Sequence, residues 1–173
     1  AGFNYKSGPN GPNYVREGIS YVVFGVKDSG GSSNFDSQIE AVDLETSGAS
    51  EGFALRPSGA GAKSGRDVAK IGDFNGDGID DLMISGQYKG HDSQREGSVF
   101  IVFGTTDGFD ETLNLEGLHG LAGIEITAKS RVVDQVGSRV SSAGDINGDG
   151  FDDIIFGEGA YSGSSTFVVF GTD

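Results

Sequence analysis

The chain has 173 residues, including 31 glycines and no cysteine, and so much glycine excludes a helical bundle, because each glycine inside a helix costs about 1 kcal/mol relative to alanine. The lack of cysteine also excludes disulfides, thiol catalysis and zinc–thiolate sites. A formal net charge of −14 and the absence of an apolar run of about 18 residues argue against nucleic acid as a partner and against membrane insertion.

Apolar segments that end in Phe-Gly recur three times along the chain, at residues 21–25, 100–104 and 167–171. Between them lie two acidic segments, residues 72–82 and 144–154, whose sequences repeat after 72 residues. A recurrence of this length indicates a repeat architecture. We therefore predict three units. Residues 1–25 form the tail of a preceding unit, namely its third strand, and residues 26–104 and 105–173 form two repeats with one acidic loop each.

The strands predicted within these units are short and differ in pattern. Residues 82–84 and 154–156 are apolar at successive positions, so both faces of these strands should be covered. Residues 53–56 and 124–127 are closer to alternating, which is typical of a half-exposed outer strand. A four-stranded antiparallel sheet packed between similar sheets, with one outer edge strand, is the blade of a β-propeller. The sequence therefore predicts an all-β fold.

One segment is open to a second interpretation. Phe35, Ile39 and Val42 have helical spacing within residues 32–47, which contain no glycine. The corresponding segment of the next unit, residues 107–116, has no such pattern. We expect irregular structure rather than a helix here, with a short helix as the alternative.

The two acidic loops carry the chemistry of the chain. Carboxylate and amide side chains stand at positions 1, 3, 5 and 9 of each loop, namely Asp73, Asn75, Asp77 and Asp81 in the first and Asp145, Asn147, Asp149 and Asp153 in the second. Oxygen ligands at alternate positions, without His or Cys, suit a hard cation, and calcium best. The main-chain carbonyl at position 7, from Ile79 or Phe151, should supply a further ligand. The sequence therefore predicts two Ca²⁺ sites.

Two alternatives compete with this interpretation. Segments rich in Asp and Gly also form ordinary β-turns, but two copies in register, each with an aspartate at position 9, favour metal binding. An EF-hand needs a bidentate glutamate at position 12, where this chain has Ile84 and Phe156. The neighbouring Asp80 and Asp152 should point away from the metal, either capping or solvated. Because the two sites lie in separate blades, we expect the effects of removing them to be nearly additive.

The pattern Gly-Asp-x-Asn-Gly-Asp-Gly-x-Asp-Asp at residues 72–81 and 144–153, with an apolar strand after it and the recurring Phe-Gly segments, closely resembles the FG-GAP repeat. This repeat builds the integrin α-subunit-type β-propeller and its bacterial relatives. The resemblance covers nearly the whole chain and implies a seven-bladed ring in which the calcium loop joins the first two strands of a blade. It also implies that the ten positions above are the calcium ligands. Repeats of this kind without cysteine look more like those of bacterial surface proteins than of animal integrins, so we expect an extracellular or cell-surface location.

In the register of that family the chain holds nine strands, about two and a quarter blades, which cannot close a ring. Unpaired strand edges and apolar sheet faces would then remain at both ends. We therefore expect contacts with other protein chains or with missing blades of the same protein. A fragment of a larger extracellular protein is the favoured interpretation.

The function that the sequence favours is that of a calcium-binding structural or adhesive module, not of an enzyme, since His91 and His119 are isolated in polar or turn-forming segments. Two alternatives remain open. The first is a carbohydrate-binding propeller segment, with a glycan as the partner and loop tyrosines as platforms, for which the candidates are Tyr5, Tyr14, Tyr88 and Tyr161. The second is an ancillary region of a larger secreted enzyme.

Overall fold

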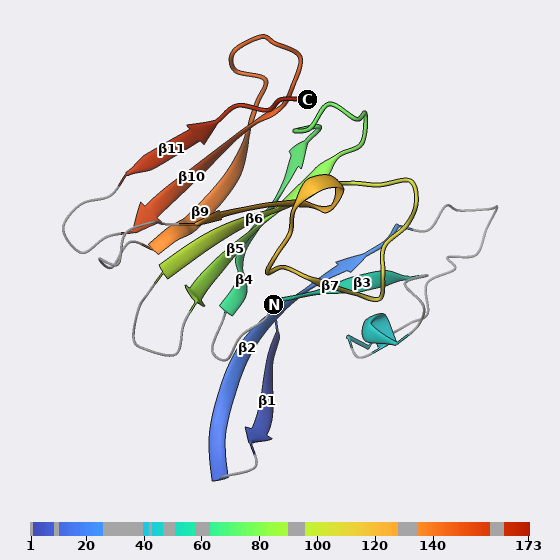
Figure 1. Cartoon of the computed structure of the whole chain (residues 1–173), viewed down its shortest axis with the longest axis vertical. Helices are drawn as coiled ribbons and strands as arrows, with labels where there is room; N and C mark the ends of the chain where they lie inside the picture. The colour runs from blue at the N-terminus through green and yellow to red at the C-terminus, as the bar shows by residue number, and fades with distance from the viewer. Residues whose placement is uncertain are drawn as a thin grey trace.

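The computed structural model describes residues 2–8, 11–25, 40–41, 43–46, 51–57, 63–89, 96–127, 135–159 and 165–173. These residues form strands and two single-turn 3-10 helices, with no α-helix among them (Figure 1). The strands are β1 (Gly2–Gly8), β2 (Gly11–Val23), β3 (Gly52–Arg56), β4 (Lys63–Gly72), β5 (Asp81–Lys89), β6 (Glu96–Val102), β7 (Thr112–Asn114), β8 (Gly123–Thr127), β9 (Gln135–Gly144), β10 (Asp153–Gly159) and β11 (Thr166–Val169). The helices are η1 (Asp43–Glu45) and η2 (Gly120–Ala122). None of the described helices is long and apolar enough to span a bilayer.

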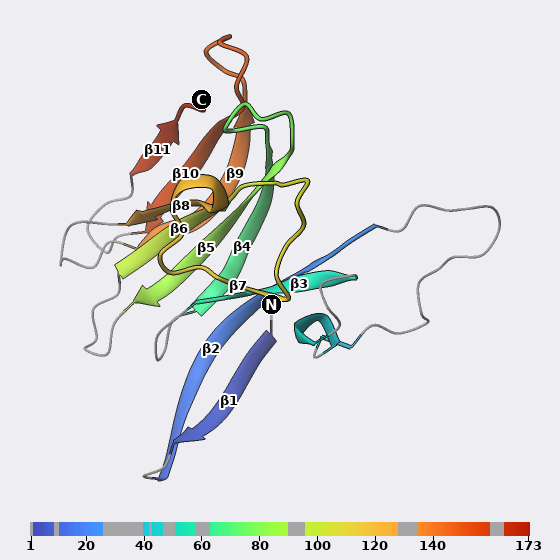
Figure 2. The same ribbon diagram turned by 45° about the vertical axis from the view of Figure 1, so that its right-hand side comes forward.

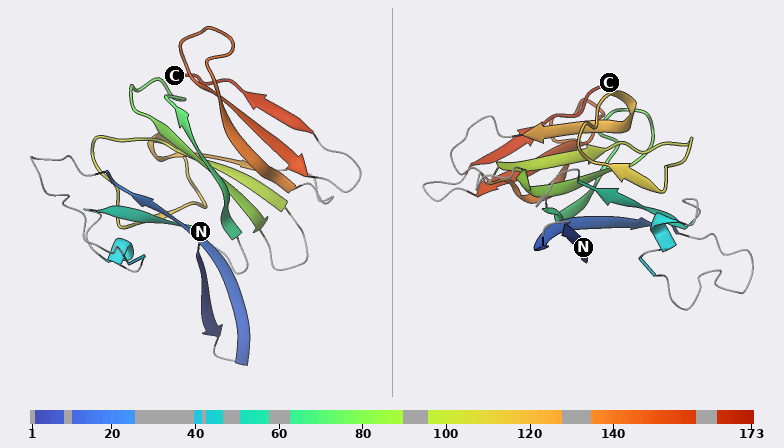
Figure 3. Two further views of the ribbon diagram at one scale, coloured as in Figure 1. Left: turned by 180° about the vertical axis from the view of Figure 1, so that it is seen from behind. Right: turned by 60° about the horizontal axis from the view of Figure 1, so that its bottom comes forward.

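The strands form three sheets that stack as layers (Figure 3, right). The N-terminal sheet has the order β1-β2-β3-β7, the middle sheet the order β4-β5-β6-β8, and the C-terminal sheet the order β9-β10-β11. In the middle sheet each strand pairs antiparallel with its neighbour, and the C-terminal sheet lies against it (Figure 2). The fold is therefore all-β and consists of partial β-propeller blades, as the sequence predicted.

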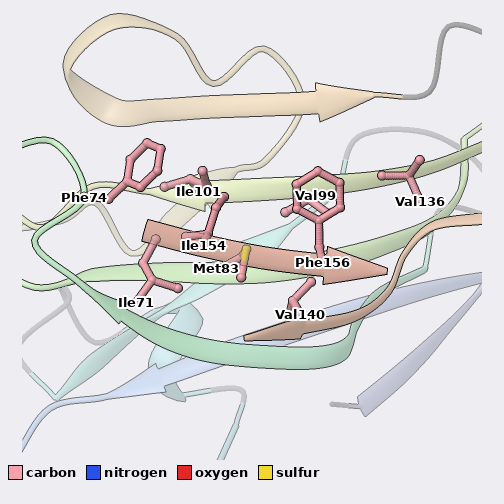
Figure 4. Packing of buried hydrophobic residues seen from close by; sticks show 9 residues of the cluster. All are labelled: Ile71, Phe74, Met83, Val99, Ile101, Val136, Val140, Ile154 and Phe156. Carbon is pink, nitrogen blue, oxygen red and sulfur yellow. The ribbon is translucent and has the colours of Figure 1, made fainter. Parts of the chain in front are cut away.

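The middle sheet is buried on both faces because its strands are apolar at successive positions. Side chains of a strand alternate between the two faces of the sheet. Met83 and Ile101 therefore face the C-terminal sheet, where they pack with Ile154 in one apolar cluster (Figure 4). Ile84 and Phe100 belong to a second cluster, shared with the N-terminal sheet. The prediction that both faces would be covered is confirmed for residues 82–84. It was wrong for residues 154–156, because among the described strands no further sheet lies on the outer face of β10, where Ile155 is only partly buried.

The prediction for residues 53–56 was wrong. Phe53, Ala54 and Leu55 are all fully buried in β3 rather than half exposed. The reason is that Phe53 and Leu55 pack in the apolar cluster shared with the middle sheet, to which Leu115, just after β7, also belongs. In addition, β7 pairs in parallel with β3 along the side that would otherwise be the edge of the N-terminal sheet. Neither β7 nor the β1 strand, which forms a hairpin with β2, was among the nine predicted strands. By contrast, β8 is the outer strand of the middle sheet, and its side chains are partly exposed as expected.

A short helix was the alternative for residues 32–47. Residues 32–39, which include Phe35 and Ile39, lie outside the described part of the chain. Residues 43–45 form only the single turn of η1. This turn is tied to the N-terminal sheet, because the carboxylate of Glu45 accepts a hydrogen bond from the Tyr21 hydroxyl at 2.9 Å and pairs with Arg56. Burial raises the pKa of Tyr21, and the bond to Glu45 acts in the same direction. Because Phe35, Ile39 and Val42 all lie outside the described residues, irregular structure in this segment stays a prediction.

Candidate metal centre

Two loops at the same edge of the stacked sheets carry the predicted ligands. Residues 73–80 join β4 to β5 and residues 145–152 join β9 to β10, and both loops lie in the upper part of Figures 1 and 2. Gly76 and Gly148 have φ angles of +74° and +77°, in the left-handed region that glycine adopts without steric strain. The tight turn expected from the glycines is therefore present in both loops.

In the first loop, the side chains at positions 1, 3 and 5 bind one another and the main chain. Asp73 Oδ2 accepts a hydrogen bond from Gly78 N at 2.9 Å. Asp77 Oδ1 accepts one from Ile79 N at 2.8 Å, and Asp77 Oδ2 accepts one from Asn75 Nδ2 at 2.9 Å. The structure therefore brings Asp73, Asn75 and Asp77 into one compact, hydrogen-bonded loop.

The second loop repeats this arrangement with one difference. Asn147 Nδ2 donates to Asp149 Oδ2 at 2.7 Å, as its counterpart does in the first loop. Both oxygens of Asp145 accept main-chain hydrogen bonds, Oδ1 from Gly148 N at 2.7 Å and Oδ2 from Gly150 N at 2.9 Å. In the first loop only one oxygen of Asp73 is bonded in this way, and its Oδ1 is buried without a hydrogen-bond partner.

The aspartate at position 9 closes each loop from inside the protein. Asp81 and Asp153 are fully buried, with 0% of their surface exposed. Asp81 Oδ2 accepts a hydrogen bond from Phe74 N at 3.0 Å, and Asp81 Oδ1 accepts one from Gly104 N at 2.8 Å. Burial raises the pKa of the Asp81 carboxyl, whereas the N–H groups of Gly104 and Phe74 lower it. Asp81 therefore connects the start of its loop to the end of β6.

The glycines of the two Phe-Gly segments that follow the acidic loops belong to the site, a role that the sequence analysis missed. In the second unit Gly171 N donates to Asp153 Oδ1 at 3.0 Å, as Gly104 does to Asp81 in the first. A Cβ at Gly104 would lie 2.6 Å from the Asp80 carbonyl oxygen, and one at Gly171 would lie 2.5 Å from that of Asp152. Only glycine permits this approach. The signal was the occurrence of one Phe-Gly segment after each acidic loop.

The donor set fits calcium, most clearly in the first loop. A buried carboxylate oxygen without a partner is costly, and Asp73 Oδ1 is such an atom. Each carboxylate oxygen has two lone pairs, so the bonds to N–H groups do not prevent these side chains from facing a cation as well. Among the residues that the structure describes, however, no three Asp, Glu, His or Cys side chains are arranged so that they could hold an ion together. Binding of an ion by these side chains would therefore require some rearrangement of the loops.

The aspartates at position 8 have different partners in the two loops. Asp80 forms an exposed ion pair with Lys70 at 2.6 Å. Asp152 Oδ2 accepts a hydrogen bond from Asp73 N at 3.0 Å, across the boundary between the middle and C-terminal sheets. Asp80 is therefore solvated and Asp152 binds a main-chain N–H group, whereas their orientation away from a metal stays a prediction. The two loops belong to separate sheets, as the sequence predicted, but they are in direct contact. That the effects of removing the two sites are nearly additive stays a prediction.

The residues considered for catalysis or glycan binding form no second site in the described part of the chain. His119 is exposed, and its Nδ1 contacts the carbonyl oxygen of Gly117. His91 and Tyr161 lie outside the described residues, and so do the side chains of Tyr5, Tyr14 and Tyr88.

Comparison with known proteins adds one finding. Residues 136–170 match the family model of the FG-GAP repeat. The match covers the second acidic loop and most of the C-terminal sheet, including the Phe-Gly segment up to Phe170. A search of curated proteins found no match for the chain.

Proposed function

Since the chain contains an FG-GAP repeat, we propose that it is a non-catalytic, calcium-binding β-propeller module that mediates protein–protein contacts in an extracellular or cell-surface protein. The observation that carries the proposal is the buried Oδ1 of Asp73, which accepts no hydrogen bond within a loop of oxygen donors. Bound calcium would supply the positive charge for this oxygen and for the neighbouring carboxylates.

The residues that would hold calcium are the side chains at positions 1, 3, 5 and 9 and the carbonyl at position 7 of each loop. They are Asp73, Asn75, Asp77, Ile79 and Asp81 in the first loop and Asp145, Asn147, Asp149, Phe151 and Asp153 in the second. Asp81 also binds Gly104 N at 2.8 Å. A loop held in this way keeps β5 and the end of β6 together, so the metal would stabilise the sheet rather than perform chemistry.

Calorimetric titration of the isolated chain should show two calcium ions bound per chain. Asp77→Ala and Asp149→Ala each remove a position-5 carboxylate and should each lower the stoichiometry to one. We expect a Kd of about 10⁻⁵ to 10⁻³ M, because neither loop has the bidentate glutamate at position 12 that strengthens EF-hands. Such an affinity suits the calcium concentration outside cells. A wild-type stoichiometry other than two, or a submicromolar Kd, would contradict the proposal.

The proposed partner surface is the outer face of the C-terminal sheet. Phe74 and Ile101 of the middle sheet are 4% and 0% exposed, because the C-terminal sheet covers them. Their repeat counterparts, Ile146 and Val168, are 56% and 42% exposed. In addition, β11 ends the order of its sheet, whereas the equivalent strand β6 pairs with β8. The outer face of the C-terminal sheet thus corresponds to the face of the middle sheet that the C-terminal sheet covers. It should therefore bind a further β-sheet of the same repeat type.

In dilute solution the isolated chain should therefore self-associate, because a second copy supplies such a sheet. Val168→Glu places a charge on the outer face and should shift the chain toward the monomer and reduce the binding of a hydrophobic dye. Leu121→Glu is the matched control, since Leu121 is almost fully exposed but lies in η2, which leads into β8 of the middle sheet. Light scattering measures the mass. A monodisperse wild-type monomer that binds no dye would exclude this surface.

A further inference from the structure

We infer that Asp152, at position 8 of the second loop, is a positioning residue for the first loop, so that calcium binding by residues 73–81 depends on the neighbouring repeat. The inference rests on the proposed function, because it concerns the same loops. It adds a role for a residue outside the set of ligands. Asp152 also belongs to the second repeat, whereas the calcium site that it would position belongs to the first.

The contact between the two loops is reciprocal. Asp73 N donates to Asp152 Oδ2 at 3.0 Å, and Asp152 N donates to the main-chain oxygen of Asp73 at 3.1 Å. A single residue, Asp152 in the loop between β9 and β10, therefore binds both the N–H and the carbonyl group of Asp73. A hydrogen bond from a main-chain N–H to a carboxylate is among the stronger kinds in proteins. Position 1 of the first loop is thus fixed from outside its own repeat.

The surrounding surfaces fit this contact closely. A Cβ at Gly72, where φ is +76°, would lie 1.9 Å from Asp152 Oδ2. A Cβ at Gly76 would lie 2.2 Å from the ring of Phe151. Thr172 N also donates to the main-chain oxygen of Phe74 at 3.1 Å. The end of β4 and the first half of the first loop therefore rest on the second repeat, and Gly72 and Gly76 leave the space that this requires.

The consequence for binding follows from the state of Asp73. Its Oδ2 accepts the N–H of Gly78, whereas its Oδ1 is buried and has no hydrogen-bond partner. With the main chain held by Asp152 and Oδ2 held by Gly78 N, the carboxylate of Asp73 has fewer orientations open to it, while Oδ1 keeps no partner within the described part of the protein. A ligand that is already held in place loses less conformational freedom when the ion binds. Removing the contact should therefore weaken the first site.

The first loop provides a matched control. Asp80 occupies the same position 8, but its carboxylate is exposed and pairs with Lys70. Substitution of Asp80 removes one carboxylate from an acidic loop, as substitution of Asp152 does, but it breaks none of the described hydrogen bonds between the two repeats. At Asp152 itself, alanine removes the acceptor, whereas asparagine removes only the charge and keeps an oxygen that can accept the N–H of Asp73.

The test measures calcium binding by calorimetry at each site separately. An Asp149→Ala background leaves the first site, and an Asp77→Ala background leaves the second. At the first site we expect Asp152→Ala to raise Kd about fivefold relative to Asp152→Asn, as the loss of one hydrogen bond between neutral groups implies. At the second site the two Asp152 variants should agree within about twofold. Asp80→Ala and Asp80→Asn should not differ from each other at either site.

A second measurement does not depend on calcium. In the presence of EGTA, hydrogen exchange at the Asp73 amide should be faster in Asp152→Ala than in Asp152→Asn and in Asp80→Ala, with circular dichroism confirming that all three remain folded. Equal exchange in the two Asp152 variants, or equal Kd values at the first site, would overturn the inference. A wild-type chain that binds no calcium would overturn the proposed function, while the exchange experiment would still decide whether Asp152 holds Asp73.

Discussion

Removal of calcium with EGTA is expected to lower the free energy of unfolding of the chain by about 5 kcal/mol, relative to calcium at 100 times its Kd. Each site contributes about 2.7 kcal/mol under that condition when the unfolded chain does not bind the ion. At this chain length about 1 kcal/mol corresponds to 2–4 °C, so Tm should fall by about 10–20 °C. The physical reason is that each loop concentrates three carboxylates, and in the first loop Asp73 Oδ1 is buried without a partner.

Thermal unfolding followed by circular dichroism, with saturating calcium and with EGTA, measures this shift. The Asp77→Ala/Asp149→Ala double variant is the control, since it lacks a position-5 ligand in both loops and should have the same Tm in both conditions. Magnesium at the same concentration should protect the wild-type chain less, because Mg²⁺ gives up its water shell reluctantly and requires near-ideal octahedral geometry. An unchanged wild-type Tm in EGTA would exclude a stabilising role for the metal.

The parts of the fold that could be predicted are those encoded locally. Residues 82–84 and 100–102 are apolar at successive positions, which indicated strands covered on both faces, and β5 and β6 are such strands. The turn at Gly76 was likewise predictable, because its neighbours Asp and Asn favour tight turns and glycine alone adopts its φ angle freely. In these segments the pattern, the local conformation and the packing all agree.

The parts that could not be predicted depend on contacts between distant segments. The parallel pairing of Ala54 with Thr112 joins residues from different predicted units, and nothing within residues 53–56 indicates this pairing or the packing of Leu115 and Leu118 against Phe53 and Leu55. The alternation of Thr112-Leu113-Asn114-Leu115 was a weak signal for β7. Similarly, Asp80 and Asp152 are identical by position in the motif, and only the stacking of the sheets gives them different partners.

Replacement of Asp81 by alanine is expected to lower the free energy of unfolding by about 3 kcal/mol even in EGTA. The substitution leaves the N–H groups of Phe74 and Gly104 without their acceptor in the protein interior. Each buried donor left unpaired costs about 1–3 kcal/mol. Part of this loss is offset, because burial of the Asp81 carboxylate is itself unfavourable and raises its pKa. Equilibrium unfolding in urea measures the difference.

Two neighbouring substitutions separate this effect from the loss of a charge. Asp80→Ala removes an exposed carboxylate from the next position and an exposed ion pair with Lys70, so it should change stability by less than about 1 kcal/mol. Asp81→Asn keeps one acceptor but places an amide N–H group against a main-chain donor, because asparagine has a single side-chain oxygen. It should therefore also destabilise the chain, although less than alanine does. If Asp81→Ala were no more destabilising than Asp80→Ala, the buried carboxylate would not be what joins the acidic loop to the Phe-Gly segment.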